Sequence, residues 1–249
     1  VHKTELAVGN AIGSNISNIA IVFCISIFFI KLSSVELSLP KRPFYGMLIL
    51  TLITLIIISI DNVFNVYDSL ILIFLFFGVV FYLKEGDSNS NDQIIYDSKE
   101  VKLFTIFPLS ILALVLLVYG SNLFITGASD IATYFGISSY VIGLTLTAIG
   151  TSLPELAASI QSAKKGRADF IIGNILGSNI FNIALAMSIA GMINSAVINE
   201  FEFLRDMAML LLCMGIFYAI VKVNKIFIKT LYSSLLVITY FLYLVFILG

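Results

Sequence analysis

Eight apolar stretches, each long enough to cross a lipid bilayer as a helix, limit how this chain can fold. They cover approximately residues 5–30, 43–60, 66–83, 102–126, 138–163, 169–195, 203–221 and 226–248. About 20 helical residues, at about 1.5 Å each, span the roughly 30 Å hydrocarbon core. With 59% of its residues hydrophobic and 12% charged, the chain carries more apolar surface than a water-soluble fold could bury. The sequence predicts an all-α, multi-pass integral membrane protein.

Lysine and arginine residues lie almost entirely in alternate loops between these stretches. Twelve of the 14 fall in the first, third, fifth and seventh loops, and only Lys3 and Arg205 fall on the opposite side. Cytoplasmic loops are the ones that retain such residues. The distribution supports the number of spans and predicts that both chain ends face outward.

Residues 5–20 and 169–184 are two copies of one motif. The first copy reads ELAVGNAIGSNISNIA and the second reads DFIIGNILGSNIFNIA, in register after a shift of 164 residues. The loop charges predict that the two copies enter the membrane from opposite sides and are therefore antiparallel. Inverted repeats with polar helix segments near the membrane midplane are typical of secondary transporters.

The repeat predicts three parts of the chain. Residues 1–83 would be the remainder of the first repeat with three helices, residues 84–101 a cytoplasmic linker, and residues 102–249 the second repeat with five helices. The second copy follows a helix with the sequence GLTLTAIGTSLPE at 143–155, whereas the counterpart of Glu155 would fall ahead of Val1. We therefore expect roughly 63 further residues, forming two helices, upstream.

Glu155 is the only carboxylate that the pattern places well inside an apolar stretch. Since a charge there costs several kcal/mol, a compensating partner is expected. Thr151 and Ser152 lie four and three residues earlier, on the same helical face. Pro154 has no N–H for the carbonyl of Gly150, so that backbone oxygen is expected to be free. A cation ligand is the favoured interpretation, and a glutamate that serves only helix packing is the alternative.

Two polar stripes run along the repeated helices at a spacing of four residues. One consists of Asn10, Ser14 and Asn18, and the other of Asn174, Ser178 and Asn182. Hydroxyl and amide oxygens suit hard ions such as Ca2+ and Na+, and the absence of thiolate and imidazole from these stripes argues against zinc or copper. The glycines beside the stripes are explained by close helix packing alone.

The strings Gly-Thr-Ser-Leu-Pro-Glu at 150–155 and Gly-Asn-x-x-Gly-Ser-Asn-x-x-Asn at 173–182 resemble the second α-repeat of the Na+/Ca2+ exchanger family of calcium/cation antiporters, prokaryotic type. Residues 9–18 resemble the latter half of the first α-repeat. The resemblance implies a ten-helix inverted-repeat antiporter, of which eight helices are present. Carried over by position, it implies these metal ligands: Ser14, Asn18, Ala148 through its carbonyl, Thr151, Ser152, Glu155, Ser178 and Asn182.

The resemblance implies a secondary active antiporter that exchanges Na+ for Ca2+ by alternating access in a prokaryotic cell membrane. The expected partners are Ca2+, Na+ and the lipid bilayer, with no cofactor, no nucleic acid and no enzymatic activity. Asn182 stands where potassium-dependent relatives have Asp, which favours a potassium-independent mode. A proton-coupled Ca2+/cation antiporter shares every motif and remains an alternative, and a cation channel lined by the same stripes is a weaker one.

Overall fold

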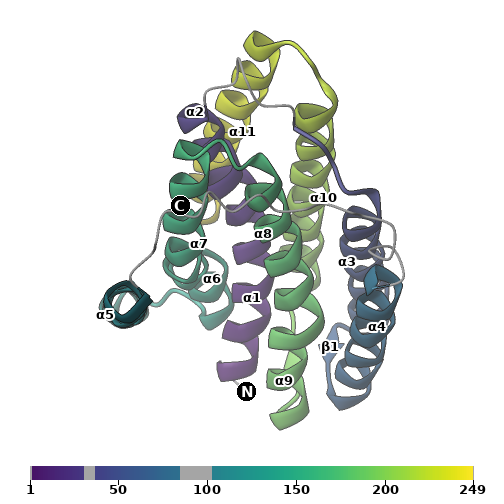
Figure 1. The fold of residues 1–249 in the computed structure, drawn as a ribbon. Helices are drawn as coiled ribbons and strands as arrows, with labels where there is room; N and C mark the ends of the chain where they lie inside the picture. The colour runs from purple at the N-terminus through teal and green to yellow at the C-terminus, as the bar shows by residue number, and fades with distance from the viewer. Residues whose placement is uncertain (1, 31–36, 85–102, 249) are drawn as a thin grey trace.

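The computed structural model describes residues 2–30, 37–84 and 103–248, which form a bundle of membrane-length helices (Figure 1). The first span contains α1 (His2–Ser17), η1 (Asn18–Phe23) and α2 (Cys24–Phe29), and α3 (Lys41–Asp61), α4 (Val66–Lys84) and α5 (Leu103–Tyr134) follow. The fifth span contains α6 (Ser139–Ile142), η3 (Gly143–Thr147) and α7 (Ala148–Lys164), and the sixth contains α8 (Ala168–Phe181), η4 (Asn182–Ala186) and α9 (Met187–Ile193). The last two are α10 (Glu200–Lys222) and α11 (Ile226–Leu248).

The eight predicted spans are confirmed. In the described ranges, eight helical segments are long and apolar enough to cross a membrane. The fourth is longer than expected, because α5 continues to Tyr134 rather than ending near residue 126. The predicted linker at 84–101 lies outside the described residues, apart from Lys84, and the division into two repeat domains stays a prediction.

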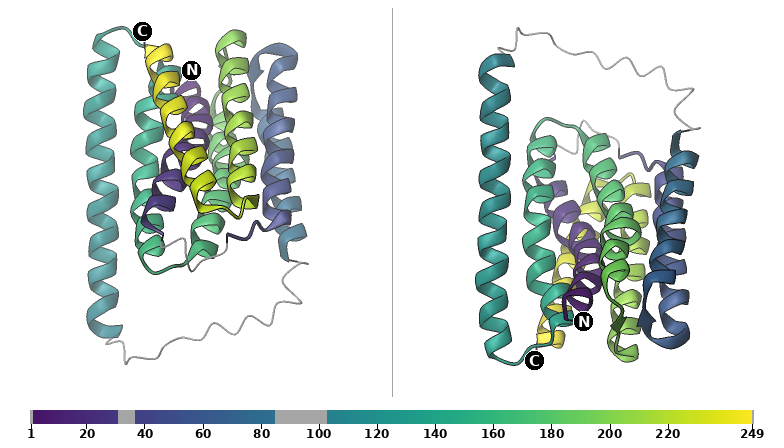
Figure 2. Two further views of the ribbon diagram at one scale, coloured as in Figure 1. Left: turned by 90° about the horizontal axis from the view of Figure 1, so that it is seen from above. Right: turned by 90° about the horizontal axis from the view of Figure 1, so that it is seen from below.

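The bundle is organised around the first span. This span is largely buried, whereas α4 exposes most of its surface. At one edge, α5 stands apart and contacts mainly α7 and η3 (Figure 2). A two-stranded antiparallel ribbon of β1 (Val63–Phe64) and β2 (Ala196–Val197) joins two interhelical turns. Both ends of the described chain lie toward the same end of the bundle, as an even number of spans requires, and which end faces the cytoplasm stays a prediction.

In the described part of the chain, three short π-helical segments interrupt the regular helices. η1 begins at Asn18 and η4 begins at Asn182, which are equivalent positions of the two repeat copies. The third, η3, ends at Thr147, directly before Ala148. Single π-helical turns are frequent at functional sites, because they change the direction of the side chains that follow. All three therefore occur in the helices that the sequence singles out.

Glycines allow α1 to approach α6 and η3 with backbone against backbone. A Cβ atom added at Gly9 would lie 2.2 Å from the carbonyl oxygen of Tyr140, and one at Gly13 would lie 2.0 Å from that of Leu144. A Cβ atom at Gly143 would lie 2.2 Å from the oxygen of Leu6. The packing role predicted for the glycines of the first copy is confirmed, and it places the first repeat directly against the helix that carries Glu155.

Candidate cation-binding site

The two repeat copies meet through a reciprocal pair of asparagines. Asn15 donates its side-chain amide to the carbonyl oxygen of Asn179 at 3.0 Å, and Asn179 donates to the carbonyl oxygen of Asn15 at 3.3 Å. Both residues are completely buried, and they occupy equivalent positions, 164 residues apart. Each side chain therefore satisfies a backbone oxygen of the other copy, which relates α1 and α8 by a local two-fold axis.

A second reciprocal pair surrounds the first. Asn18 donates to the side-chain oxygen of Asn179 at 3.0 Å, and Asn182 donates to the side-chain oxygen of Asn15 at 3.1 Å. Asn18 also donates to the hydroxyl of Ser178 at 3.1 Å. Hydrogen bonds between buried side chains of two helices favour one arrangement of those helices. The predicted ligands Asn18, Ser178 and Asn182 are thus brought together at the junction of the repeats.

Hydroxyl groups connect α1 to α7 in the turn before Glu155. The Ser14 and Thr151 hydroxyls lie 2.9 Å apart, and those of Ser17 and Ser152 lie 2.7 Å apart. Thr151 also donates to the side-chain oxygen of Asn10 at 3.2 Å. Three further members of the predicted set, Ser14, Thr151 and Ser152, therefore meet at the contact between α1 and α7.

Backbone oxygens of α7 also take part. The carbonyl oxygen of Ala148 lies 3.2 Å from the Thr151 hydroxyl and is an alternative acceptor to Asn10 for its single proton. Pro154 lies inside a helix that continues without interruption to Lys164. The carbonyl of Gly150, which was expected to be free, accepts a hydrogen bond from the hydroxyl of Ser121 on α5. The edge helix α5 thereby reaches the turn that precedes Glu155.

Two of the eight predicted ligands keep a buried oxygen without a hydrogen-bond donor in the described parts of the chain. They are the side-chain oxygen of Asn18 and Oε2 of Glu155, whose side chain is half-buried. Buried polar atoms of native proteins almost always have a partner, so such an atom needs an explanation. A carboxylate oxygen and an amide oxygen are ligands that Ca2+ and Na+ accept. The donor set fits a hard cation as transported cargo.

Sequence reasoning missed four residues of this arrangement. Asn15 and Asn179 belong to the repeated string but lie outside both polar stripes, so their reciprocal bonds could have been suspected from their matched positions alone. Ser17 corresponds to Phe181 in the second copy. Because the comparison of the two copies selects residues that are polar in both, it did not identify Ser17. Gly120-Ser121 also fits the helix that precedes the second repeat in the family, but the sequence did not indicate that Ser121 contacts Gly150.

The glycines of the two repeat copies do not have equivalent surroundings in the described residues. Gly173 and Gly177 are the equivalents of Gly9 and Gly13, but both are exposed. A Cβ atom added at either would meet no atom within 4 Å in the described residues. The packing role expected for this second pair has no partner in the described ranges.

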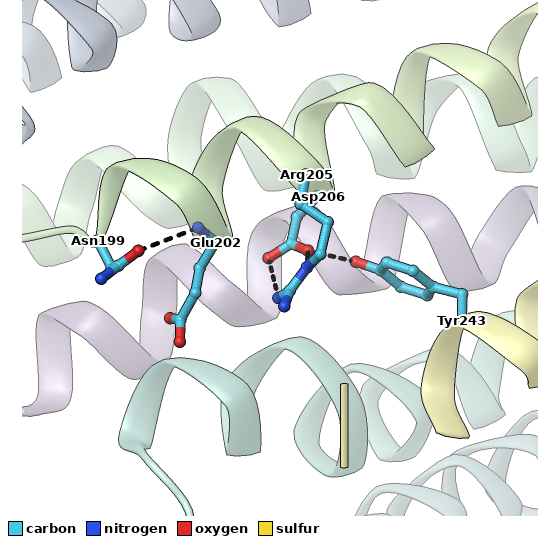
Figure 3. A network of polar contacts seen from close by, with 5 residues as sticks. All are labelled: Asn199, Glu202, Arg205, Asp206 and Tyr243. Carbon is cyan, nitrogen blue, oxygen red and sulfur yellow. Dashed lines mark hydrogen bonds and ion pairs between the residues drawn. The ribbon is translucent and has the colours of Figure 1, made fainter. Parts of the chain in front are cut away.

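A second buried polar cluster was not predicted. Asp206 on α10 is completely buried, so the expectation that Glu155 is the only such carboxylate is wrong. Its Oδ1 accepts from Nε of Arg205 at 2.6 Å and from the Tyr243 hydroxyl at 2.7 Å, and its Oδ2 accepts from Nη2 of Arg205 at 3.1 Å (Figure 3). The residue lies near the start of α10, which Asn199 caps by accepting from the backbone N–H of Glu202. It is the fourth residue of the apolar stretch predicted at 203–221, so the sequence pattern did not place it well inside a span.

This cluster ties α10 to α11, and we expect Tyr243→Phe to destabilise the protein by about 2 kcal/mol. Hydrogen bonds to charged groups contribute about 1.5–3 kcal/mol, because the partner stays buried when the donor is lost. Thermal unfolding of the purified protein is the measurement. Tyr232→Phe on the same helix, at a 37% exposed side chain, is the matched control and should change stability by less than about 0.5 kcal/mol. Equal effects of the two changes would contradict the inferred role of the cluster.

Comparisons with known proteins agree with this architecture. The sequence profile of a family described as sodium/calcium exchanger protein matches residues 1–84 and 105–249. The inner membrane protein YrbG of Escherichia coli (strain K12) is 32% identical over 231 residues, which cover 86% of this chain and 68% of that protein. The sodium/calcium exchanger MaX1 of Methanosarcina acetivorans is 40% identical over 119 residues, 48% of this chain and 34% of that protein.

A solved structure extends the similarity to the fold. The sodium-calcium exchanger NCX_Mj, soaked with 2.5 mM Na+ and 1 mM Sr2+, superposes with a TM-score of 0.68 at 28% identity and covers 98% of this chain and 77% of that one. Two curated relatives match more than four fifths of this chain. The matched residues make up about two thirds of the length of each relative.

Proposed function

The chain belongs to the sodium/calcium exchanger protein family, whose members are exchangers and transporters rather than enzymes, and from this premise we propose that it exchanges Na+ for Ca2+ by alternating access. Membership of the family supports a cation antiporter in the membrane. The coupling of Ca2+ transport to Na+ rather than H+ is our proposal. The observation that supports it most strongly is the buried oxygen of Glu155 that has no donor among the described residues, one helical turn after hydroxyls that contact the oppositely oriented repeat.

Hard oxygen ligands from both repeats would enclose the transported ion. Glu155 supplies the negative charge, and Asn18 supplies a buried amide oxygen that its own hydrogen bonds leave free. The remaining proposed ligands are the side chains of Ser14, Thr151, Ser152, Ser178 and Asn182 and the carbonyl of Ala148. Asparagine and serine add oxygen atoms without charge, which limits the total negative charge and so favours Na+ and Ca2+ over a more highly charged ion.

Charge neutralisation provides the coupling. A site that holds one Ca2+ or several Na+ crosses the hydrocarbon nearly neutral, whereas an empty site carries an uncompensated buried carboxylate. Any net charge that moves also experiences about 2.3 kcal/mol per 100 mV of membrane potential. Exchange is therefore favoured over uncoupled leak, because the empty site is the costly state.

A second helix completes the site in this proposal. α6, η3 and α7 pack against Gly9 and Gly13 of the first copy, so the local two-fold relation places an equivalent helix against Gly173 and Gly177. Such a helix would bring a second carboxylate to the junction opposite Glu155. Two carboxylates would balance the charge of one Ca2+ ion.

The test is Ca2+ flux into vesicles that contain the full-length protein. With Na+ loaded inside, outward-directed Na+ gradients should increase Ca2+ uptake, and collapse of that gradient with a Na+ ionophore should abolish the increase. A pH gradient of the same size, with Na+ absent, separates the proton-coupled alternative. Uptake driven by pH and indifferent to Na+ would replace the proposed coupling ion by H+, and uptake indifferent to both would reject antiport.

A further inference from the structure

An apolar groove lies between α3 and α4, far along the sequence from the ion-site residues. It has a volume of about 270 Å³ and is lined by Gly46, Ile49, Leu75, Gly78, Val79 and Tyr82. Two glycines shape it in different ways. A Cβ atom at Gly46 would lie 2.8 Å from Val79, so this glycine lets the helices touch. One at Gly78 would meet no atom of the described segments within 4 Å, and this glycine leaves the groove open.

The groove opens on a surface built to face hydrocarbon. Two residues of its own lining, Ile49 and Tyr82, are 50% and 45% exposed. Large exposed apolar side chains of this kind face lipid in a membrane-spanning bundle. The lining itself is almost wholly apolar, so its natural occupant is an acyl chain or another apolar segment.

Arg42 stands at one end of the groove in a fixed position. Its Nη1 donates to the carbonyl oxygen of Tyr82 at 3.2 Å, and its guanidinium lies 5.0 Å from the centre of the Tyr82 ring. Because Tyr82 also lines the groove, these two contacts hold the guanidinium at its rim. A guanidinium has five N–H donors, and most remain available for a phosphate group, which arginine binds with bidentate geometry.

The same end of the hairpin carries further positive charge. Lys41 begins α3 and Lys84 ends α4, and both are exposed, as is Arg42. Within residues 2–30, 37–84 and 103–248, no carboxylate forms an ion pair with any of the three. Positively charged residues at the end of a membrane helix attract anionic lipids, and the loop charges predict that this end faces the cytoplasm.

We propose that this groove is a binding site for an anionic phospholipid, with an acyl chain between Gly46 and Gly78 and the phosphate group at Arg42. Charge complementarity selects this occupant, because a phosphate group offers Arg42 an anionic partner and an apolar protein helix does not. A zwitterionic lipid would offset the phosphate charge with its own amine. This inference does not depend on the transported ion.

A single introduced tryptophan tests the proposal, because the sequence contains none. Ile49→Trp places a fluorophore in the groove, and Leu116→Trp places a control on α5, where residue 116 is 60% exposed and the helix has no Lys or Arg. The full-length protein is reconstituted in equal mixtures of phosphatidylglycerol and phosphatidylcholine, with brominated acyl chains on one lipid at a time. Quenching of each tryptophan then reports which lipid is its neighbour.

At Ile49→Trp, we expect phosphatidylglycerol to bind about fivefold more tightly than phosphatidylcholine, since one cation near the surface accounts for about that factor. At Leu116→Trp, the ratio should be close to one. Adding Arg42→Gln or, separately, Lys84→Gln to the Ile49→Trp protein should lower the ratio, with the larger effect from Arg42. Adding Gly78→Leu should reduce quenching by both lipids.

Several outcomes would overturn the proposal. Equal quenching by the two lipids at Ile49→Trp would leave no preference for an anionic headgroup. A ratio unchanged in Arg42→Gln would remove that residue as the phosphate ligand. Absence of quenching by either lipid would mean that a protein segment, rather than a lipid, occupies the groove.

Discussion

Glu155→Gln is expected to abolish Ca2+ uptake into vesicles, with a loss of at least two orders of magnitude in rate at a fixed Ca2+ concentration. Glutamine has the same size and can still accept hydrogen bonds, so helix packing around position 155 should be preserved. The negative charge is lost, and an amide N–H2 donor replaces one ligand oxygen. Removing one partner of a buried charge pair costs about 3–5 kcal/mol, which corresponds to a factor of about 10² to 5 × 10³ in affinity.

A matched control separates charge at this site from charge elsewhere. Glu200→Gln makes the same chemical change at an exposed position in the first turn of α10 and should leave uptake within about twofold of the original rate. Both proteins should unfold at nearly the same temperature. Full Ca2+ uptake by Glu155→Gln would remove Glu155 from the proposed ion site, and a large loss in Glu200→Gln would show that the assay responds to surface charge.

Gly13→Ala is expected to lower the stability of the protein by about 3 kcal/mol or more, although it adds a single methyl group. The new Cβ atom would lie 2.0 Å from the oxygen and 2.6 Å from the carbon of the Leu144 carbonyl, and 2.8 Å from Cβ of Ala148. A backbone carbonyl cannot rotate away, so α1 must separate from η3. That movement would also stretch the contacts of Ser14 with Thr151 and of Ser17 with Ser152, which are 2.9 Å and 2.7 Å long.

The two cysteines of the chain provide the measurement. Cys24 and Cys213 are both free and completely buried, so a thiol-reactive fluorophore labels them only as the protein unfolds. For a chain of this size, a loss of about 3 kcal/mol corresponds to a decrease of roughly 10 °C in the apparent midpoint. Ca2+ uptake should fall in parallel, because the residues that move are proposed ligands.

Gly215→Ala is the matched control for the glycine substitution. Gly215 lies in the interior of α10 and is exposed, and a Cβ atom there would meet no described residue within 4 Å. Alanine has the higher helix propensity, so this change should be neutral or stabilising by up to about 1 kcal/mol. If Gly13→Ala behaved like Gly215→Ala, the close approach of α1 to η3 would be contradicted.

The membrane-spanning architecture could be predicted almost completely from the sequence. Apolar length identified all eight spans, because crossing the hydrocarbon core sets a minimum number of apolar residues regardless of what surrounds the helix. The exception was the end of α5, which continues to Tyr134 through a segment of Gly, Ser and Asp. Composition predicts a helix end there, whereas the backbone continues the helix beyond the apolar stretch.

The composition of the candidate site was also predictable in part. The repeated strings and the lone carboxylate identified Asn18, Glu155 and Ser178 as chemically unusual positions, because polar residues in apolar helices carry a cost that needs a reason. Asp206 escaped the same reasoning. Asp206 is buried because Tyr243 and Arg205 donate hydrogen bonds to its carboxylate. Local hydrophobicity predicts neither contact.

The sequence by itself determined the number of helices, their repeat and the residue types that could bind a cation, because apolar length, periodicity and polarity are local properties of the chain. Only the tertiary structure decided which oxygen atoms meet. The Asn15 and Asn179 bonds, the serine contacts across α1 and α7 and the unpaired oxygen of Glu155 depend on how closely glycine faces let two helices approach. That distance is set by packing between segments more than 100 residues apart, and no local pattern encodes it.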